Sequence, residues 1–402
     1  MVEGGVFASK TFNENRPEND PNVGIFIYLL AAAAVIGGFI FGYDASIVSA
    51  AMLYVPDNPG MQPVTDEWHE LIVSVTSGMA ILGALLSGQT CDLIGRKMAV
   101  ILGSLIFAFG SLVCAAAWNK VVLVIGRVFI GIAIGFSSIS TLVYVGETSP
   151  SSIRGSLVST YQVMIALGQV SANLIGGGLS YIDPANVGWR LMFGLAALPA
   201  LFQCVCFFFL PESPRYLYKK GRKEETEEVL RKIYGTSEDW VTYEMEEISM
   251  TLDEEKRALE SCENQTVLRR ILTTPHVLKA TIVGSLCRVF QQLCGVNNIM
   301  YYTGDIIKST GIKSSHTSIW ISAATTSLNF LGTLVPALFI ERMGRRKIFL
   351  FSIVAVLISL IALGTAFKLI NDDSHPTYSI DEYNSGNHFN SSFYNAQRCM
   401  KY

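Results

Sequence analysis

Two basic turns of the same kind lie between long apolar segments, one in each half of the chain. The first spans residues 92–97 (DLIGRK), and the second spans residues 341–347 (ERMGRRK). Each combines an acid, a glycine and a cluster of arginine and lysine, as expected of a tight cytoplasmic turn between membrane helices. The repetition predicts a duplicated helical bundle, an architecture that many secondary transporters share.

The composition is typical of a chain that lies mostly in lipid. Of the 402 residues, 50% are hydrophobic and only 16% are charged, whereas a soluble domain usually holds about 25% charged residues. The net charge of -3 gives no basis for nucleic-acid binding. We therefore expect the lipid bilayer to be the main surrounding of this protein.

Nine apolar runs approach or exceed the roughly 20 residues that cross a bilayer. They are about 25–52, 71–90, 98–117, 121–145, 156–180, 191–210, 278–307, 317–340 and 348–369. The positive-inside rule places both basic turns and the N-terminus in the cytoplasm. Residues 53–70 contain no lysine or arginine, which places them outside.

This topology predicts five regions. They are a cytoplasmic tail (1–24), a six-helix bundle (25–210), a cytoplasmic linker (211–276), a partial second bundle (277–370) and an extracellular segment (371–402). The linker is rich in charges of both signs, which favours a solvated connection over a docking site. Asn390 begins an Asn-Ser-Ser acceptor in the extracellular segment and is a candidate glycosylation site.

Six short motifs follow one another along the chain. They are GGFIFGYD at 37–44, DLIGRK at 92–97, GR at 126–127, ETSPSSIRG at 147–155, PESPR at 211–215 and QQLCGVN at 291–297. In this order and at these places they resemble the sugar porter family of the major facilitator superfamily, over essentially the whole length. The resemblance implies an all-α membrane protein with the major facilitator fold.

Within that family the chain is most similar to the proton-coupled myo-inositol cotransporters. Asp44, the string NNIMYY at 297–302 and the segment after the ninth run carry this similarity. Facilitative hexose carriers usually have a neutral residue at the position of Asp44. A complete family member would have twelve spans, so we expect a C-terminally truncated chain with an incomplete, three-helix second bundle.

Asp44 is the most unusual single residue. An ionisable side chain inside a membrane helix costs at least a few kcal/mol and rarely occurs without a partner or a role. The resemblance implies that Arg127 of the fourth run is its partner. Burial disfavours a charged carboxyl, and a nearby guanidinium favours it. We hypothesise that protonation of Asp44 breaks the pair during each cycle; a fixed structural ion pair is the alternative.

Amide side chains in the apolar runs are candidates for sugar recognition. Gln162 and Gln169 lie seven residues apart, on one face of a helix. The resemblance implies that six residues contact the sugar: Gln162, Gln169, Gln291, Gln292, Asn297 and Asn329. Hydrogen bonds between helices are the alternative role for each amide. Tyr301 and Tyr302 are candidate gate residues, with ordinary packing as the alternative.

A third set of candidates lies on the cytoplasmic side. The resemblance implies a latch between the two bundles, formed by Asp92, Arg96, Glu147, Arg154, Glu212, Arg215, Glu341, Arg345 and Arg346. The alternative is that the basic residues only set the topology.

These observations predict proton-coupled symport of a polyol or sugar by alternating access, with myo-inositol favoured. The alternatives are a facilitative hexose uniporter and a non-transporting, truncated regulatory isoform. No nucleophile–base pair or metal-binding motif is present in the sequence, so we expect no enzyme activity, no metal and no cofactor beyond the co-transported H⁺. We expect a multi-pass protein of the plasma membrane.

Overall fold

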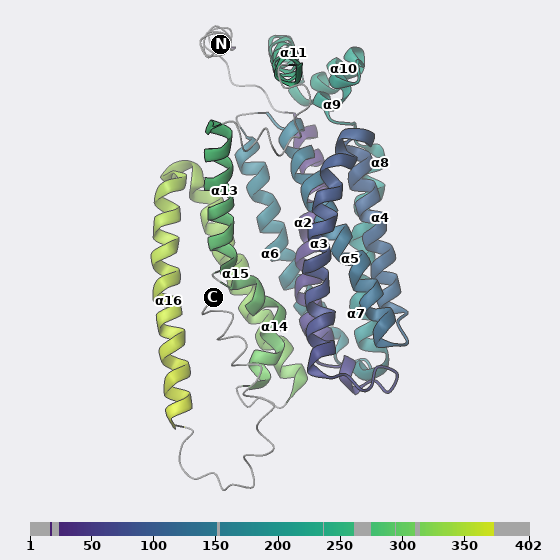
Figure 1. Cartoon of the computed structure of the whole chain (residues 1–402), viewed down its shortest axis with the longest axis vertical. Coiled ribbons are helices and arrows are strands. Elements are labelled where there is room, and N and C mark those ends of the chain that lie inside the picture. The colour runs from purple at the N-terminus through teal and green to yellow at the C-terminus, as the bar shows by residue number, and fades with distance from the viewer. Residues whose placement is uncertain are drawn as a thin grey trace. The chain divides into compact units, whose positions relative to one another are not determined.

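The computed structural model describes residue 17 and residues 24–150, 153–235, 237–260, 275–293, 295–309 and 314–373. Every regular element within these residues is a helix, as the sequence predicts. Figure 1 shows their arrangement and labels. Nearly all of the predicted tail 1–24 and most of the predicted segment 371–402 lie outside the described residues.

The six predicted runs of the first half all form helices. They are α2 (Ile25–Met52), α3 (Asp66–Ile94), α4 (Arg96–Ala115), α5 (Lys120–Thr148), α6 (Arg154–Leu179) and the pair α7 (Trp189–Leu195) and α8 (Ala197–Phe209). Two short turns, η1 (Val55–Asp57) and η2 (Pro184–Gly188), lie between them. The sixth run is divided at Ala196 because Pro199 lacks the N–H that would bond to the carbonyl of Leu195.

Glycines allow the helices of this bundle to approach closely. α2 packs mainly on α6, and α3 packs on α5. A Cβ at Gly42 of α2 would lie 1.9 Å from the carbonyl oxygen of Ile165, and one at Gly135 of α5 would lie 2.0 Å from that of Ala80. Small residues at such contacts are the usual means by which membrane helices associate.

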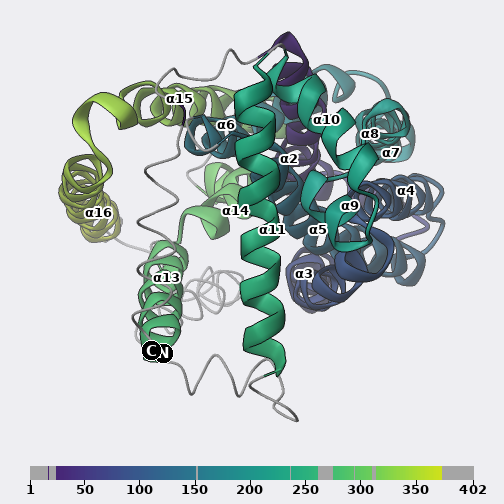
Figure 2. The ribbon, with the colours of Figure 1, turned by 90° about the horizontal axis from the view of Figure 1, so that it is seen from above.

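The segment after α8 folds onto one end of the bundle. It forms α9 (Pro214–Lys219), α10 (Lys223–Tyr234) and α11 (Glu238–Glu260), which lie across the helix ends in Figure 2. Leu230, Ile233 and Trp240 are buried in one cluster with Ile27 and Leu30 of α2. The sequence did not predict this packing of the linker helices on the bundle. Their charged residues cover the outer face only, and the apolar residues of α10 are spaced for an inner face.

Four helices follow the linker: α13 (Pro275–Leu293), α14 (Val296–Ser309), α15 (Ser315–Met343) and α16 (Arg345–Asp373). The predicted run 278–307 is two helices, separated at Gly295, whose φ is +74°. Only glycine adopts this conformation without strain.

The chain divides into two compact units, which we describe separately. The first comprises Met1–Ala280 and Asn297–Ala337, so α14 and most of α15 belong with the first bundle. The second comprises Thr281–Val296 and Leu338–Tyr402, and therefore contains most of α13 and all of α16.

Both basic turns have the predicted form. Gly95 joins α3 to α4 with a φ of +99°, and Gly344 joins α15 to α16 with a φ of +80°. In each turn one helix ends directly before the glycine and the next begins directly after it. We call the end of the first unit at Gly95 the basic end, and the end at residues 53–65 the opposite end.

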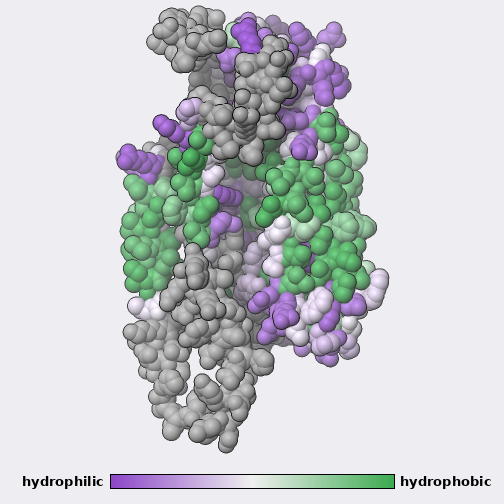
Figure 3. Space-filling model, viewed as in Figure 1, coloured by the Kyte–Doolittle hydropathy of each residue, from purple (hydrophilic) through white to green (hydrophobic). Residues whose placement is uncertain are grey.

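Apolar surface surrounds the helices of the first bundle. Six stretches of the described residues are long and apolar enough to cross a membrane: Phe26–Asp57, Asp66–Ile94, Arg96–Ala115, Lys120–Thr148, Pro184–Phe209 and Ser315–Val335. Figure 3 shows an apolar belt over α3, α4 and their neighbours, with polar surface at both ends. α6, which carries Gln162, Gln169 and Asn173, is not among these stretches.

Candidate functional site

A buried ion pair joins α2 to α5. Arg127 Nη1 lies 2.5 Å from Asp44 Oδ1, and the two side chains are 0% and 1% exposed. Arg127 Nε donates to the carbonyl oxygen of Ile72 at 3.3 Å, and the guanidinium carbon lies 5.8 Å from the centre of the Phe193 ring. The structure thus brings together the two residues that the sequence predicts to be partners.

The hydrogen bonding of this pair is incomplete within the described residues. Asp44 Oδ2 and Arg127 Nη2 are buried, and neither has a hydrogen-bond partner there. Buried charges are tolerated when they are paired and hydrogen-bonded. Within the described residues, the Asp44 carboxylate is therefore hydrogen-bonded through Oδ1 alone.

Polar side chains of α6 and α15 form a second buried cluster. Asn329 Nδ2 donates to Gln169 Oε1 at 3.1 Å, and Asn173 Nδ2 donates to Thr326 Oγ1 at 3.3 Å. Gln169, Asn173 and Thr326 are all buried. The cluster presents amide and hydroxyl groups that both donate and accept hydrogen bonds, as a polyhydroxyl ligand requires.

Sequence reasoning identified Gln169 and Asn329 but missed Asn173 and Thr326. Helical spacing contained the missing signal, because Asn173 follows Gln169 by four residues and Thr326 precedes Asn329 by three. Residues three and four apart lie on the same face of a helix.

The other predicted sugar contacts lie on α6 and on α13 or are outside the described residues. Gln162 lies on α6 but is exposed. Gln291 and Gln292 are exposed residues of α13 in the second unit, where Arg288 Nη1 donates to Gln291 Oε1. The side chain of Asn297 lies outside the described residues.

The ion pair and the amide cluster are linked through the α2–α6 contact. A Cβ at Gly168 would lie 2.2 Å from the carbonyl oxygen of Phe39 and 2.8 Å from the backbone nitrogen of Tyr43. Tyr43 directly precedes Asp44, and Gly168 directly precedes Gln169. The two backbones therefore touch next to both candidate functional residues.

α14 packs against the first bundle through the two predicted gate tyrosines. Tyr301 and Tyr302 are half-buried and contact its hydrophobic core. The Tyr302 ring meets the His69 ring of α3 edge-on, with centroids 6.3 Å apart. The backbone N–H of Gly304 donates to Ser49 Oγ at 3.1 Å, which ties α14 to α2.

His316, near the start of α15, forms a further contact at the opposite end that the sequence did not indicate. Its Nδ1 lies 2.7 Å from Ser180 Oγ, and its ring stacks on Tyr181 with centroids 5.0 Å apart. Ser180 Oγ also donates to the carbonyl oxygen of Gly177 at 2.6 Å. Ser180, at the C-terminal end of α6, and His316 therefore join α6 to α15.

Charged residues gather around Gly95 at the basic end. Arg96 Nη2 lies 2.9 Å from Glu147 Oε1 of α5, and Arg96 Nη1 lies 3.2 Å from Asp92 Oδ1 of α3. Ser213 Oγ donates to Glu147 Oε2. Three predicted latch residues thus contact one another within the first unit.

Glu212 caps the N-terminus of α4. Its Oε1 accepts from the backbone N–H groups of Arg96, Lys97 and Ser213, each at 2.9 Å. The first N–H groups of a helix have no partner within the helix, and the carboxylate also faces the positive end of the helix dipole. Burial raises the pKa of Glu212, and the hydrogen bonds and Arg96 offset only part of the rise.

Two further latch candidates have contacts of another kind. Arg154 donates to the carbonyl oxygen of Ser149 from Nε at 3.3 Å and from Nη2 at 3.1 Å. Arg215 Nη2 lies 4.0 Å from Glu247 Oε1 of α11. Both therefore stabilise the basic end of the first unit.

The remaining candidates are largely outside the described residues. These are the side chains of Glu341 and Arg345 and the glycosylation candidate Asn390, whereas Arg346 is described and exposed in the second unit. Among the described residues no group of three His, Cys, Asp or Glu side chains is arranged to hold a metal ion.

Most of the chain matches a known family. Residues 30–381 match the family described as "Sugar (and other) transporter". The chain belongs to this sugar transporter family. Its members are transporters rather than enzymes, as the sequence predicts, and the protein is an integral membrane protein with several spans.

Named relatives of this sugar transporter sequence include inositol transporters. The proton myo-inositol cotransporter hmit-1.1 of Caenorhabditis elegans is 51% identical over 403 residues, which cover 100% of this chain and 66% of that protein. The proton myo-inositol cotransporter of Homo sapiens is 38% identical over 344 residues, which cover 86% of this chain and 52% of that protein. The chain thus spans between 52% and 66% of the length of these two relatives.

Solved structures show the same fold. The xylose transporter XylE from E. coli, in a partially occluded inward-open conformation, has a TM-score of 0.67 at 23% identity, covering 80% of this chain and 75% of that chain. XylE bound to 6-bromo-6-deoxy-D-glucose, described as a proton:xylose symporter of the major facilitator superfamily, has a TM-score of 0.70 at 24% identity, covering 80% of this chain and 70% of that chain. This sugar transporter family member therefore has the predicted major facilitator fold.

Proposed function

We propose that the protein carries a polyol across the plasma membrane together with a proton, by alternating access. Myo-inositol is the favoured substrate, because two relatives in different animals are named proton myo-inositol cotransporters. The buried ion pair between Asp44 and Arg127 supports the proton coupling.

Asp44 exchanges the transported proton in this proposal. The ionised carboxylate holds Arg127 and thereby joins α2 to α5. Protonation removes the negative charge of the carboxylate and with it the Coulomb attraction to the guanidinium, so the contact weakens. α2 then moves relative to α5. The proton is the coupling ion, and no further cofactor takes part.

The polyol binds to the amides of α6 and α15. A hydroxyl group both donates and accepts, so it can insert between Gln169 and Asn329 without leaving either amide unsatisfied. Asn173 and Thr326 extend the same surface. By family resemblance, Gln162, Gln291, Gln292 and Asn297 complete the site.

The contact between α2 and α6 couples the two events. No side chain separates the backbones where Gly168 meets Phe39 and Tyr43. A shift of α2 after protonation of Asp44 is therefore transmitted directly to Gln169. Tyr301 and Tyr302 act as gates at the opposite end, and the charged residues around Gly95 act as a latch at the basic end.

Uptake of radiolabelled myo-inositol by the protein in proteoliposomes tests this function. With acid outside and a neutral interior, we expect accumulation above the external concentration, with a limit of roughly tenfold for each pH unit because a unit corresponds to about 1.4 kcal/mol. A protonophore should abolish the accumulation.

Other outcomes would contradict the proposal in specific ways. Uptake that only equalises the two concentrations, and that is inhibited better by a hexose than by myo-inositol, would indicate a facilitative hexose uniporter. Absence of both uptake and exchange in protein that is correctly folded would favour the regulatory alternative.

A further inference from the structure

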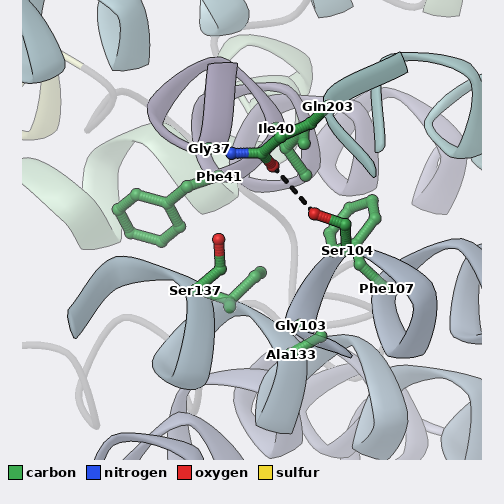
Figure 4. A pocket seen from close by; sticks show the side chains of 10 residues that line it. Gly37, Ile40, Phe41, Gly103, Ser104, Phe107, Ala133, Ser137 and Gln203 are labelled. Atoms are coloured by element: carbon green, nitrogen blue, oxygen red, sulfur yellow. Dashed lines mark hydrogen bonds between the residues drawn. The ribbon is translucent and has the colours of Figure 1, made fainter. Parts of the chain in front are cut away.

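A small cavity lies inside the first bundle, among α2, α4, α5 and α8 (Figure 4). It has a volume of about 10 Å³, and its polar lining comes from Ser104, Ser137 and Gln203. Gly37 of α2 borders it seven residues before Asp44, which is two helical turns. The volume is close to the minimum that holds one water molecule.

Three polar atoms lie close around Gly37, which has no side chain. A Cβ at this position would lie 3.1 Å from Gln203 Nε2, 3.1 Å from Thr141 Oγ1 and 3.2 Å from Ser137 Oγ. Figure 4 shows the Ser137 hydroxyl and the Gln203 amide directed toward this space. The two hydroxyls of α5 and the amide of α8 therefore converge beside Gly37, which borders the cavity.

Two hydroxyl groups of α5 differ from their neighbours. Ser138, Ser140 and Thr148 donate to carbonyl oxygens of their own helix at 2.7, 2.9 and 2.7 Å. Ser137 Oγ and Thr141 Oγ1 are buried and have no hydrogen-bond partner among the described residues. Thr141 is 0% exposed. Buried polar atoms nearly always have a partner, so these two hydroxyls indicate a ligand.

Gln203 of α8 supplies the third group. Its side chain is fully buried. Ser104 Oγ donates to its Oε1 at 3.1 Å, and its Nε2 donates to the carbonyl oxygen of Ala34 at 3.3 Å. An amide nitrogen carries two hydrogens, so Nε2 can also donate to a ligand beside Gly37.

We propose that one water molecule binds in this cavity, accepts a hydrogen bond from Gln203 and donates to Ser137 and Thr141. The lining contains no charged side chain, which favours a neutral ligand over an ion. The water connects α5 to α8 across the face of α2 that leads to Asp44. Gln203 also donates to the carbonyl oxygen of Ala34, so the water site adjoins the part of α2 between Asp44 and the basic end.

X-ray radiolytic footprinting of the purified protein tests the proposal. In this experiment, hydroxyl radicals formed from a bound water oxidise the side chains beside it. Phe107 lines the cavity and is 2% exposed, whereas Phe207 is 0% exposed and lies outside the lining. We expect oxidation of Phe107 to exceed that of Phe207, because both are shielded from bulk water and only one adjoins the bound molecule.

Variants show whether the oxidation of Phe107 depends on the proposed water site. Gly37→Ala fills the space, and the Ser137→Ala, Thr141→Val double variant removes two partners of the water. In both, oxidation of Phe107 should fall to the level of Phe207. Gly146→Ala is the matched control, because a Cβ at this position on α5 would meet nothing within 4 Å. This variant should leave the oxidation of Phe107 unchanged.

The double variant decides the outcome if Gly37→Ala does not fold. Equal oxidation of Phe107 and Phe207 in the wild-type protein would overturn the proposal. Oxidation of Phe107 that persists in the folded double variant would overturn it as well.

Discussion

Gln169 and Asn329 are 160 residues apart in the sequence, and the fold brings their side chains to 3.1 Å. Both were predictable as functional candidates, because an amide in an apolar run needs a hydrogen-bonding partner. Which amide meets which was not predictable, since this depends on how α6 and α15 pack. Thr326 was overlooked because the sequence contains many hydroxyl residues, and only the packing of α6 and α15 shows that this one meets Asn173.

Thr326→Val tests the amide cluster at the level of one atom. The variant removes one hydrogen-bonding oxygen from the proposed binding surface, while Asn173 Nδ2 keeps its donation to the carbonyl oxygen of Gln169; one lost hydrogen bond costs about 0.5–1.5 kcal/mol. We expect the KM for myo-inositol to rise roughly tenfold with little change in kcat, because 1.4 kcal/mol corresponds to a factor of ten.

Thr325→Val is the matched control for this prediction. Thr325 is exposed, and its hydroxyl donates to the carbonyl oxygen of Ile321 in the same helix. Its replacement should leave the KM unchanged. A similar rise in both variants would show that the cluster does not bind substrate.

Glu212→Gln tests the buried cap of α4. Because burial raises the pKa of Glu212 above its usual value of 4.5, the folded protein binds this proton more tightly than the unfolded chain does. The resulting stabilisation is complete below pH 4.5 and is lost as the pH rises through the raised pKa. The Tm of the wild-type protein should therefore fall relative to that of the variant as the pH rises across this window.

Thermal unfolding in detergent at a series of pH values measures this difference. Glu228→Gln is the comparison, because the hydrogen bond from Lys232 lowers the pKa of the exposed Glu228. The Tm difference between wild type and this variant should therefore change with pH in the opposite direction. A Tm difference between wild type and Glu212→Gln that does not vary with pH would show that the cap is not coupled to proton binding.

The helices and their turns were largely predictable. Runs of apolar residues gave the bounds of α2 to α6 within a few residues, and the acid–glycine–basic strings gave both turns at Gly95 and Gly344. These features are local, because they depend on hydrophobic length and on a glycine with positive φ. Pro199 and Gly295 also mark the two helix breaks in the sequence, although run length alone does not reveal them.

The docking of the linker was not predicted. Its charges suggested a solvated segment, but Val229, Leu230 and Ile233 place an apolar face on α10. The surface that this face covers includes Ile27, about 200 positions earlier in the sequence. A pairing of this kind requires the tertiary structure.

Gly95→Ala tests the turn between α3 and α4. A Cβ at Gly95 would be strained by its φ of +99° and would lie 2.3 Å from Glu212 Oε2. With a ψ of +163°, Gly95 lies in a backbone region that essentially only glycine adopts; strain there costs roughly 1–3 kcal/mol, and displacement of the cap adds to it. We expect the free energy of unfolding to fall by about 2–4 kcal/mol in total, the sum of strain and a lost cap, as measured by denaturant titration.

Gly221→Ala separates the two contributions. Gly221 has a φ of +80°, and a Cβ there would meet nothing within 4 Å. Its replacement should show the backbone strain alone and therefore a smaller loss. Equal losses in the two variants would mean that Glu212 contributes nothing to the cost at Gly95.

At the scale of the whole molecule, the candidate proton site and the amide cluster of α6 and α15 lie within one compact unit. The ion pair of Asp44 and the amide of Gln169 are joined by the backbone contact between α2 and α6. This arrangement gives proton binding a short mechanical route to the substrate. Asp44 is therefore the residue that couples the two gradients in the proposed function, and the contact between α2 and α6 transmits its protonation to the amide cluster.

The most direct test compares net uptake with exchange in the Asp44→Asn variant. Asparagine keeps the shape of the side chain but cannot take up the transported proton. We predict that uptake of myo-inositol loses its dependence on the pH gradient while exchange of labelled for unlabelled myo-inositol continues. Asp57→Asn, at an exposed residue of η1, should retain both activities. Gradient-dependent uptake that persists in Asp44→Asn would contradict the central claim that Asp44 carries the proton.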